Sequence, residues 1–77
     1  MPTVMRIKGY RFGFFSADAD DPPHVHVSKG GDQAKFWLDP VQLAKDAGFA
    51  RHELNEVFGL VQEYQQELLK GWHEYFG

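Results

Sequence analysis

Two histidines, His24 and His26, stand one residue apart in a segment of alternating residue types. In a β-strand, residues i and i+2 share a face with Cα atoms roughly 6.6 Å apart, so both imidazoles would lie on one side. Histidine is the usual general acid/base and the commonest metal ligand. Four interpretations are open for this pair: catalysis, metal binding, a binding role, and an ordinary solvent-facing position.

For catalysis, the two imidazoles would flank a phosphodiester while Lys35 or Lys29 stabilises the developing charge, which suits cleavage of RNA through its 2′-hydroxyl. The catalytic candidates are therefore His24, His26 and Lys35. For metal binding, His24 and His26 would need at least a third donor. The side chains that would have to approach are Asp20, Asp21, His52 and His73. We expect neither a metal nor another cofactor.

A hairpin is predicted to position this pair. Residues 24–38 form two alternating runs separated by Gly30-Gly31, which suits a two-residue turn with positive φ. The turn sets the register, so that His24 faces Trp37 and His26 faces Lys35. The residues predicted to point inward are Val25, Val27, Ala34, Phe36 and Leu38, and those predicted to point outward are His24, His26, Lys35 and Trp37.

Trp37 is a large aromatic residue on the predicted outer face. It is covered either by a loop of this chain or by a partner. Arg6, Arg11 and Lys35 would supply positive charge near it, as in platforms that bind single-stranded nucleic acid. The predicted binding residues are Arg11, His24, His26, Lys35 and Trp37.

The remaining segments predict an α+β fold. Residues 4–16 read as two strands about a Lys8-Gly9 turn, and residues 41–49 as a strand or an irregular segment. Residues 51–76 carry apolar side chains at three- and four-residue spacing, which indicates a helix. We therefore predict an antiparallel sheet of two N-terminal hairpins, with three to five short strands, packed on one long C-terminal amphipathic helix.

Composition is typical of one small domain spanning residues 1–77. The chain has no cysteine, and its first twenty residues hold several charges without an unbroken apolar run. We therefore expect a cytoplasmic protein without a membrane segment. The net charge of −3 argues against binding nucleic acid through a bulk positive field, but the acidic excess lies in the C-terminal half, so a locally basic sheet face is compatible with it.

Pro2 is a weaker candidate. Removal of Met1 would leave an N-terminal proline, whose secondary amine is the base of tautomerases. In those enzymes a long helix follows the proline strand, whereas a hairpin is predicted to follow Pro2.

Four segments, GYRFGFFS, DPPHVHV, AKFWLDPVQLA and ELLKGWHEYF, occur in this order over nearly the whole chain. In this combination the chain resembles the small bacterial proteins of the family named domain of unknown function 4160. The resemblance implies a partner, because such proteins are often encoded beside a small protein of the family domain of unknown function 2442, in a pairing similar to a toxin-antitoxin arrangement. It implies no catalytic residues; Pro22, Pro23, His24 and His26 match the family's most recognisable motif.

We therefore expect one of two functions, the first ahead of the second. The first is a small interaction protein that acts with a nearby-encoded protein partner, with a homo-oligomer also possible. The second is a histidine-dependent ribonuclease that uses the His24/His26 face.

Overall fold

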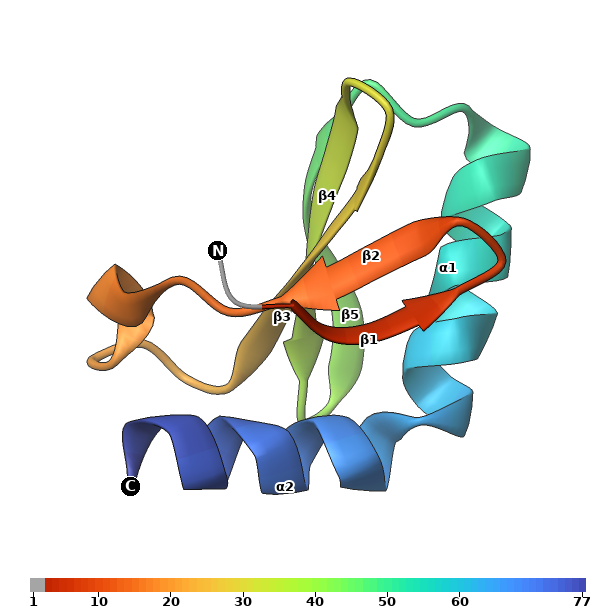
Figure 1. Cartoon of the computed structure of the whole chain (residues 1–77). Coiled ribbons are helices and arrows are strands. Elements are labelled where there is room, and N and C mark those ends of the chain that lie inside the picture. Colours follow the sequence, from red (N-terminus) through yellow and green to blue (C-terminus); the bar gives the residue numbers. More distant parts are fainter. Residues whose placement is uncertain (1–2) are drawn as a thin grey trace.

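The computed structural model describes residues 3–77, apart from the side chain of Asp18, and shows an α+β arrangement of one sheet and two helices (Figure 1). The elements are, in chain order, β1 (Thr3–Ile7), β2 (Tyr10–Gly13), a short 3-10 turn η1 (Ser16–Asp18), β3 (His24–Lys29), β4 (Asp32–Leu38), β5 (Val41–Ala47), α1 (Arg51–Glu63) and α2 (Gln65–Phe76). Helix α1 runs along one flank of the sheet, and α2 crosses beneath the end at which β3 begins (Figure 1). No helix of the described residues is long and apolar enough to cross a membrane.

The sheet has five strands in the order β1-β2-β3-β4-β5, and each neighbouring pair is antiparallel. The strand count lies within the predicted range, but the prediction of two separate hairpins was incomplete, because the strands form one continuous meander. Residues 41–47, which the sequence left as strand or irregular, form β5.

The predicted register of the β3–β4 hairpin is confirmed: His24 pairs with Trp37 and His26 with Lys35. Gly30 supplies the positive φ of 60° at the turn. The β1–β2 turn is also confirmed, with φ of 53° at Lys8 and 82° at Gly9. Residue alternation and turn chemistry were enough to predict these turns because each hairpin is a local structure.

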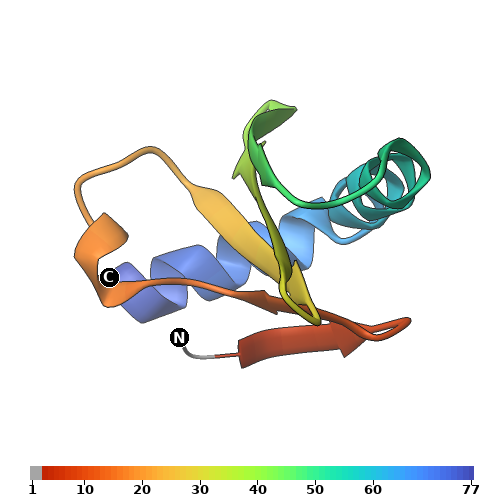
Figure 2. The same cartoon turned by 90° about the horizontal axis from the view of Figure 1, so that it is seen from above.

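The prediction of one long helix was wrong. The helical segment is interrupted at Tyr64, which has φ −104° and ψ 17°, and α2 leaves the break in a different direction from α1 (Figure 1). The sheet twists, with β4 and β5 turned relative to β1 and β2, so two shorter helices follow its curved surface better than one straight helix (Figure 2). Gln65 stabilises the break, since its Nε2 donates to the carbonyl oxygen of Leu38 at 2.6 Å.

One hydrophobic core joins the helices to the inner face of the sheet. Its buried members are Tyr10, Phe12, Phe14, Val25, Val27, Ala34, Phe36, Leu38, Phe49, Val57, Leu60, Val61, Leu68 and Trp72. All five residues predicted to point inward from the β3–β4 hairpin are among them. The opposite, outer face of the sheet is therefore the surface on which polar side chains of the strands gather.

Gly48 and Gly59 provide a first matched test of this packing. Gly48 has φ 117°, and a Cβ atom there would clash with the side chain of Asp32, whereas nothing lies within 4 Å of a Cβ atom added at Gly59. We expect Gly48→Ala to lower the free energy of unfolding by about 1–3 kcal/mol. Gly59→Ala should raise it by about 1 kcal/mol through better helix propensity. Urea unfolding of both variants measures this, and equal effects would contradict the described conformation at Gly48.

Candidate functional site

The sequence predicted that His24 points outward, but its side chain is fully buried, with 0% exposure. Its Nδ1 lies 2.9 Å from the carbonyl oxygen of Pro22. Since a carbonyl oxygen can only accept, Nδ1 carries the proton and donates this hydrogen bond. The proline-rich approach to β3 thus closes over the imidazole and holds it in one orientation.

Aromatic rings surround His24. Its ring centroid lies 5.0 Å from His26, 5.5 Å from Trp37 and 5.0 Å from Trp72. Trp72 comes from α2, which crosses the end of the sheet where β3 begins (Figure 1). His24 is the first residue of β3 and therefore lies at the end of the sheet that α2 crosses. Strand alternation alone would place its side chain on the outer face, but the contact with α2 covers it. His24 is accordingly a packing residue at the end of the sheet.

His26 has a different environment, because it lines two adjoining hollows on the outer face. The first, of about 180 Å³, is lined by Phe15, His26, Gln33, Ala34, Lys35, Lys45 and Ala47. The second, of about 280 Å³, is lined by Arg11, Phe15, His26, Val27, Ser28, Gly30 and Gln33. Phe15, His26 and Gln33 belong to both, so the two hollows form one depression, which we call the outer hollow.

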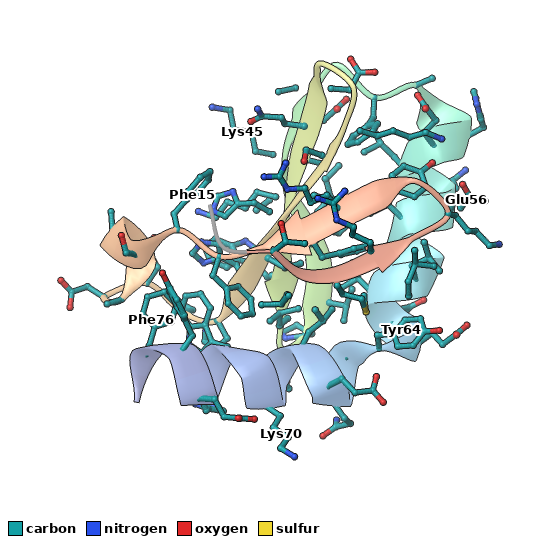
Figure 3. The ribbon with its side chains drawn as sticks, viewed as in Figure 1. Phe15, Lys45, Glu56, Tyr64, Lys70 and Phe76 are labelled. Atoms are coloured by element: carbon teal, nitrogen blue, oxygen red, sulfur yellow. The ribbon has the colours of Figure 1, made fainter. Side chains whose placement is uncertain are left out.

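Phe15 was not predicted as a site residue. It is 40% exposed, and its ring centroid lies 4.1 Å from that of His26. Figure 3 shows Phe15 and Lys45 on the side of the sheet away from both helices. The signal in the sequence was the pair Phe14-Phe15, because two successive residues at the end of a strand cannot both point into the core.

Three cations border the outer hollow: Arg11, Lys35 and Lys45. Arg11 donates from Nε to Thr3 Oγ1 at 2.8 Å, and Lys35 Nζ lies 4.6 Å from the ring centroid of Trp37. Both contacts orient a positive charge without neutralising it. Neither hollow is lined by a carboxylate, and no salt bridge joins these three cations to an acidic side chain among residues 3–77 with Asp18 set aside.

Like charges also stand directly opposite each other on this face. Arg6 pairs with Arg11 across β1 and β2, and Lys35 pairs with Lys45 across β4 and β5. Such cross-strand pairs of like charge destabilise a sheet. Two such pairs lie on the face that holds the outer hollow, among whose described lining residues there is no carboxylate.

Lys45 reaches the outer face through a β-bulge. The β4–β5 register shifts between Lys35 and Phe36, so that Leu43 pairs with Phe36 while Lys45 pairs with Lys35. Ala44 is the extra residue of this bulge. Without the bulge, strict alternation would place Lys45, two residues after Leu43, on the same side as Leu43. The bulge therefore directs Lys45 into the outer hollow, and sequence alternation could not reveal this residue.

On the helix side of the sheet, Glu56 of α1 contacts two polar side chains of the β1–β2 hairpin. Tyr10 donates its hydroxyl to Glu56 Oε1 at 2.9 Å, and Lys8 Nζ lies 3.8 Å from Glu56 Oε2. Lys29 Nζ lies 4.8 Å from the ring centroid of Tyr10. Burial, and then the hydrogen bond and charge of Glu56, raise the pKa of Tyr10 from 10.0 to about 12.

The raised pKa of Tyr10 leads to a pH-dependent prediction. Between pH 10 and 12 the unfolded chain loses the phenolic proton while the folded chain keeps it, so the stability contributed by Tyr10 is complete below pH 10 and lost toward pH 12. We expect Tyr10→Phe to cost about 1 kcal/mol at neutral pH through the lost hydrogen bond. The difference from wild type should shrink from pH 10 upward in urea unfolding, and a constant difference would contradict this assignment.

A metal site at His24 and His26 would need a third ligand. In the described part of the chain, no group of three His, Cys, Asp or Glu side chains lies together in an arrangement that could hold a metal ion. His52 lies in α1 and His73 in α2, both exposed. Pro2, the possible N-terminal base, lies outside the described residues. Of the predicted catalytic set, the structure leaves His26 and Lys35 on the outer hollow and places His24 in the core.

The comparisons with known proteins identify a family. No curated protein matches the chain. No solved structure matches it either. The sequence model of the domain of unknown function DUF4160 matches residues 9–73, which include β2 to β5, the lining residues of the outer hollow and most of the two helices. The chain therefore belongs to the DUF4160 family, as its segments predicted.

Proposed function

We propose that this protein is a small cytoplasmic interaction module that binds an acidic protein partner through the outer hollow. The partner is a small protein encoded nearby, of the domain of unknown function 2442 type, in a two-gene system of toxin-antitoxin type. The observation that carries the proposal is the set of cations around the hollow. It includes the like-charge pair Lys35 and Lys45, and no carboxylate lies among the lining residues that the structure describes.

The chemistry of the surface suits a protein partner. Arginine and aromatic residues are enriched among the residues that dominate binding energy at protein interfaces, and the outer hollow combines Arg11 with Phe15. The chain as a whole carries a net charge of −3, which argues against binding nucleic acid through a bulk positive field. A partner that places carboxylates beside Lys35 and Lys45 would relieve their mutual repulsion on binding.

The direct test is to purify this chain together with its neighbouring gene product and to measure their association by calorimetry at low and moderate salt. We expect a complex whose affinity falls as salt rises, because the contact depends on the cations of the hollow. A chain that ignores its neighbour at every salt concentration would count against the proposal. The charge-reversal variants that locate the contact are described in the Discussion.

Ribonuclease activity is a second candidate, supported by the position of His26 directly opposite Lys35 on β4. One imidazole and one cation at a shared hollow are a reduced form of the acid/base arrangement that RNA cleavage needs. If the protein is a nuclease, inducing the wild-type chain should degrade total RNA, and His26→Ala at equal abundance should lose that activity by about 100-fold or more. Intact RNA after induction of the wild type would remove this candidate. His24→Ala is unsuitable for the test because His24 is buried.

A further inference from the structure

Strand β5 is an open edge of the sheet. It pairs with β4 on one side only and is the last strand in the order. Six of its seven residues are exposed, and Leu43 keeps 45% of its surface accessible. An edge strand presents backbone N–H and C=O groups that can pair with another strand, and proteins commonly cover such edges unless they are used.

The two sides of β5 differ in chemistry. On the outer side, Lys45 and Ala47 line the outer hollow together with Lys35. On the inner side, Leu43 lies opposite Phe36, whose ring centroid is 6.2 Å from that of Phe58 in α1. The same inner side also holds Asp46, opposite Ala34, whose Oδ1 accepts a hydrogen bond from the Phe49 N–H at 3.1 Å. A strand added along this edge would therefore meet a cationic surface on the outer side and, beside Leu43, an apolar one on the inner side.

We propose that the partner contributes an extended acidic segment that pairs with β5 as a sixth strand. Its alternate side chains are carboxylates that lie beside Lys45 and Lys35, and the intervening side chains are apolar and lie beside Leu43. This inference rests on the proposed function, because it specifies how the partner uses the outer hollow. It belongs to the general mode of β-strand addition, in which backbone hydrogen bonds give affinity and side-chain pockets give specificity.

Charge decides between this occupant and a second copy of the chain. A second copy that paired its own β5 with this edge, with the same face outward, would bring another Lys45 to the outer side of the sheet, where Lys35 and Lys45 already lie, while its Asp46 would lie on the inner side. Like-charge contacts across an interface disfavour association. An acidic segment neutralises the same surface, and its apolar side chains extend the cluster of Phe36, Leu43 and Phe58.

The test uses three kinds of capped synthetic peptide, four peptides in all, matched in length to β5, which has 7 residues. The first alternates glutamate and valine, and the second alternates lysine and valine. The third is the glutamate peptide with N-methyl groups on alternate backbone amides, made in two versions that methylate either set. Each is titrated to millimolar concentration into the nitrogen-15-labelled full chain, and amide chemical shifts are followed.

We expect the glutamate peptide to shift the amides of Val41–Ala47 and the lysine peptide to leave them unchanged. Because only alternate amides of an added strand face β5, one methylated version should bind more than about tenfold more weakly while the other binds normally. The variant Lys45→Glu should bind the lysine peptide more tightly than the glutamate peptide. The control Lys70→Glu, a charge reversal at an exposed position of α2, should keep the wild-type preference for the glutamate peptide.

Three outcomes would overturn strand addition. One is the absence of shifts in β5 with the glutamate peptide at millimolar concentration. Another is shifts confined to Arg11 and Phe15 that neither methylated version alters, which would leave the acidic partner in place but exclude pairing with the edge. The third is self-association through Val41–Ala47 without any peptide, which would assign the edge to a second copy. Failure of the neighbouring protein to bind at all would refute the proposed function separately.

Discussion

Replacing Trp72 by alanine is expected to lower the free energy of unfolding by about 3–5 kcal/mol, a large share of the total for a domain of this size. Trp72 is 5% exposed, and its ring lies 5.4 Å from Phe14, 5.0 Å from His24 and 4.2 Å from Phe76, measured between centroids. Its removal leaves a cavity at the junction of α2, β3 and the segment after β2. Because that junction covers His24, the variant should also expose the imidazole.

Urea unfolding measures the effect, and Tyr75→Ala is the matched control. Tyr75 belongs to the same aromatic group, with its ring centroid 6.0 Å from that of Phe14, but it is 40% exposed. We expect Tyr75→Ala to cost about 1 kcal/mol. If Trp72→Ala proves too unstable to purify, Trp72→Phe keeps an aromatic ring and should lose less stability. Equal costs for Trp72→Ala and Tyr75→Ala would contradict the described docking of α2.

Reversing two charges of the outer hollow should weaken partner binding on the order of 100-fold. The variant Lys35→Glu/Lys45→Glu places two carboxylates where we propose that the partner also presents carboxylates. Like charges brought together at an interface cost several kcal/mol, and about 2.8 kcal/mol corresponds to a factor of 100. Calorimetry with the neighbouring gene product measures the change in affinity.

The control reverses the same number of charges on the helices. Arg51→Glu/Lys70→Glu gives an identical change in net charge, and both residues are exposed, Arg51 in α1 and Lys70 in α2. Figure 3 shows Lys70 pointing away from the sheet. We expect this control to bind within about threefold of wild type, since only the long-range field changes. Equal loss in both double variants would place the contact elsewhere.

The single variant Lys45→Glu separates binding from stability within this prediction, and it keeps the contact of Lys35 with Trp37. It replaces the like-charge pair of Lys35 and Lys45 by an opposite-charge pair, which should raise the free energy of unfolding by about 0.5–1 kcal/mol. The same change should weaken binding to the acidic partner. A variant that gains stability while it loses affinity is what we expect of a surface whose residues are selected for function.

Local chemistry determined much of this fold from the sequence. The Gly30-Gly31 turn and the alternation on both sides of it predicted every pair of the β3–β4 hairpin that was named, including His26 with Lys35. The Lys8-Gly9 turn likewise predicted that β1 and β2 are two strands joined by a turn at these residues. The four characteristic segments predicted the family, which the match over residues 9–73 confirms. In each case the signal lies within a few residues, where turn geometry and side-chain alternation act directly.

The tertiary structure decided three further features. Apolar spacing continues through Tyr64, so the break between α1 and α2 follows from the twisted sheet and from the hydrogen bond of Gln65 to Leu38. His24 is buried because α2 reaches the start of β3. Lys45 joins the outer hollow because a bulge against β4 changes the side that it faces. The sequence by itself thus specified the strands and their neighbours. Contacts between distant segments decided which side chains lie on the surface. The reason is that burial depends on what packs over a residue and not on its position along a strand.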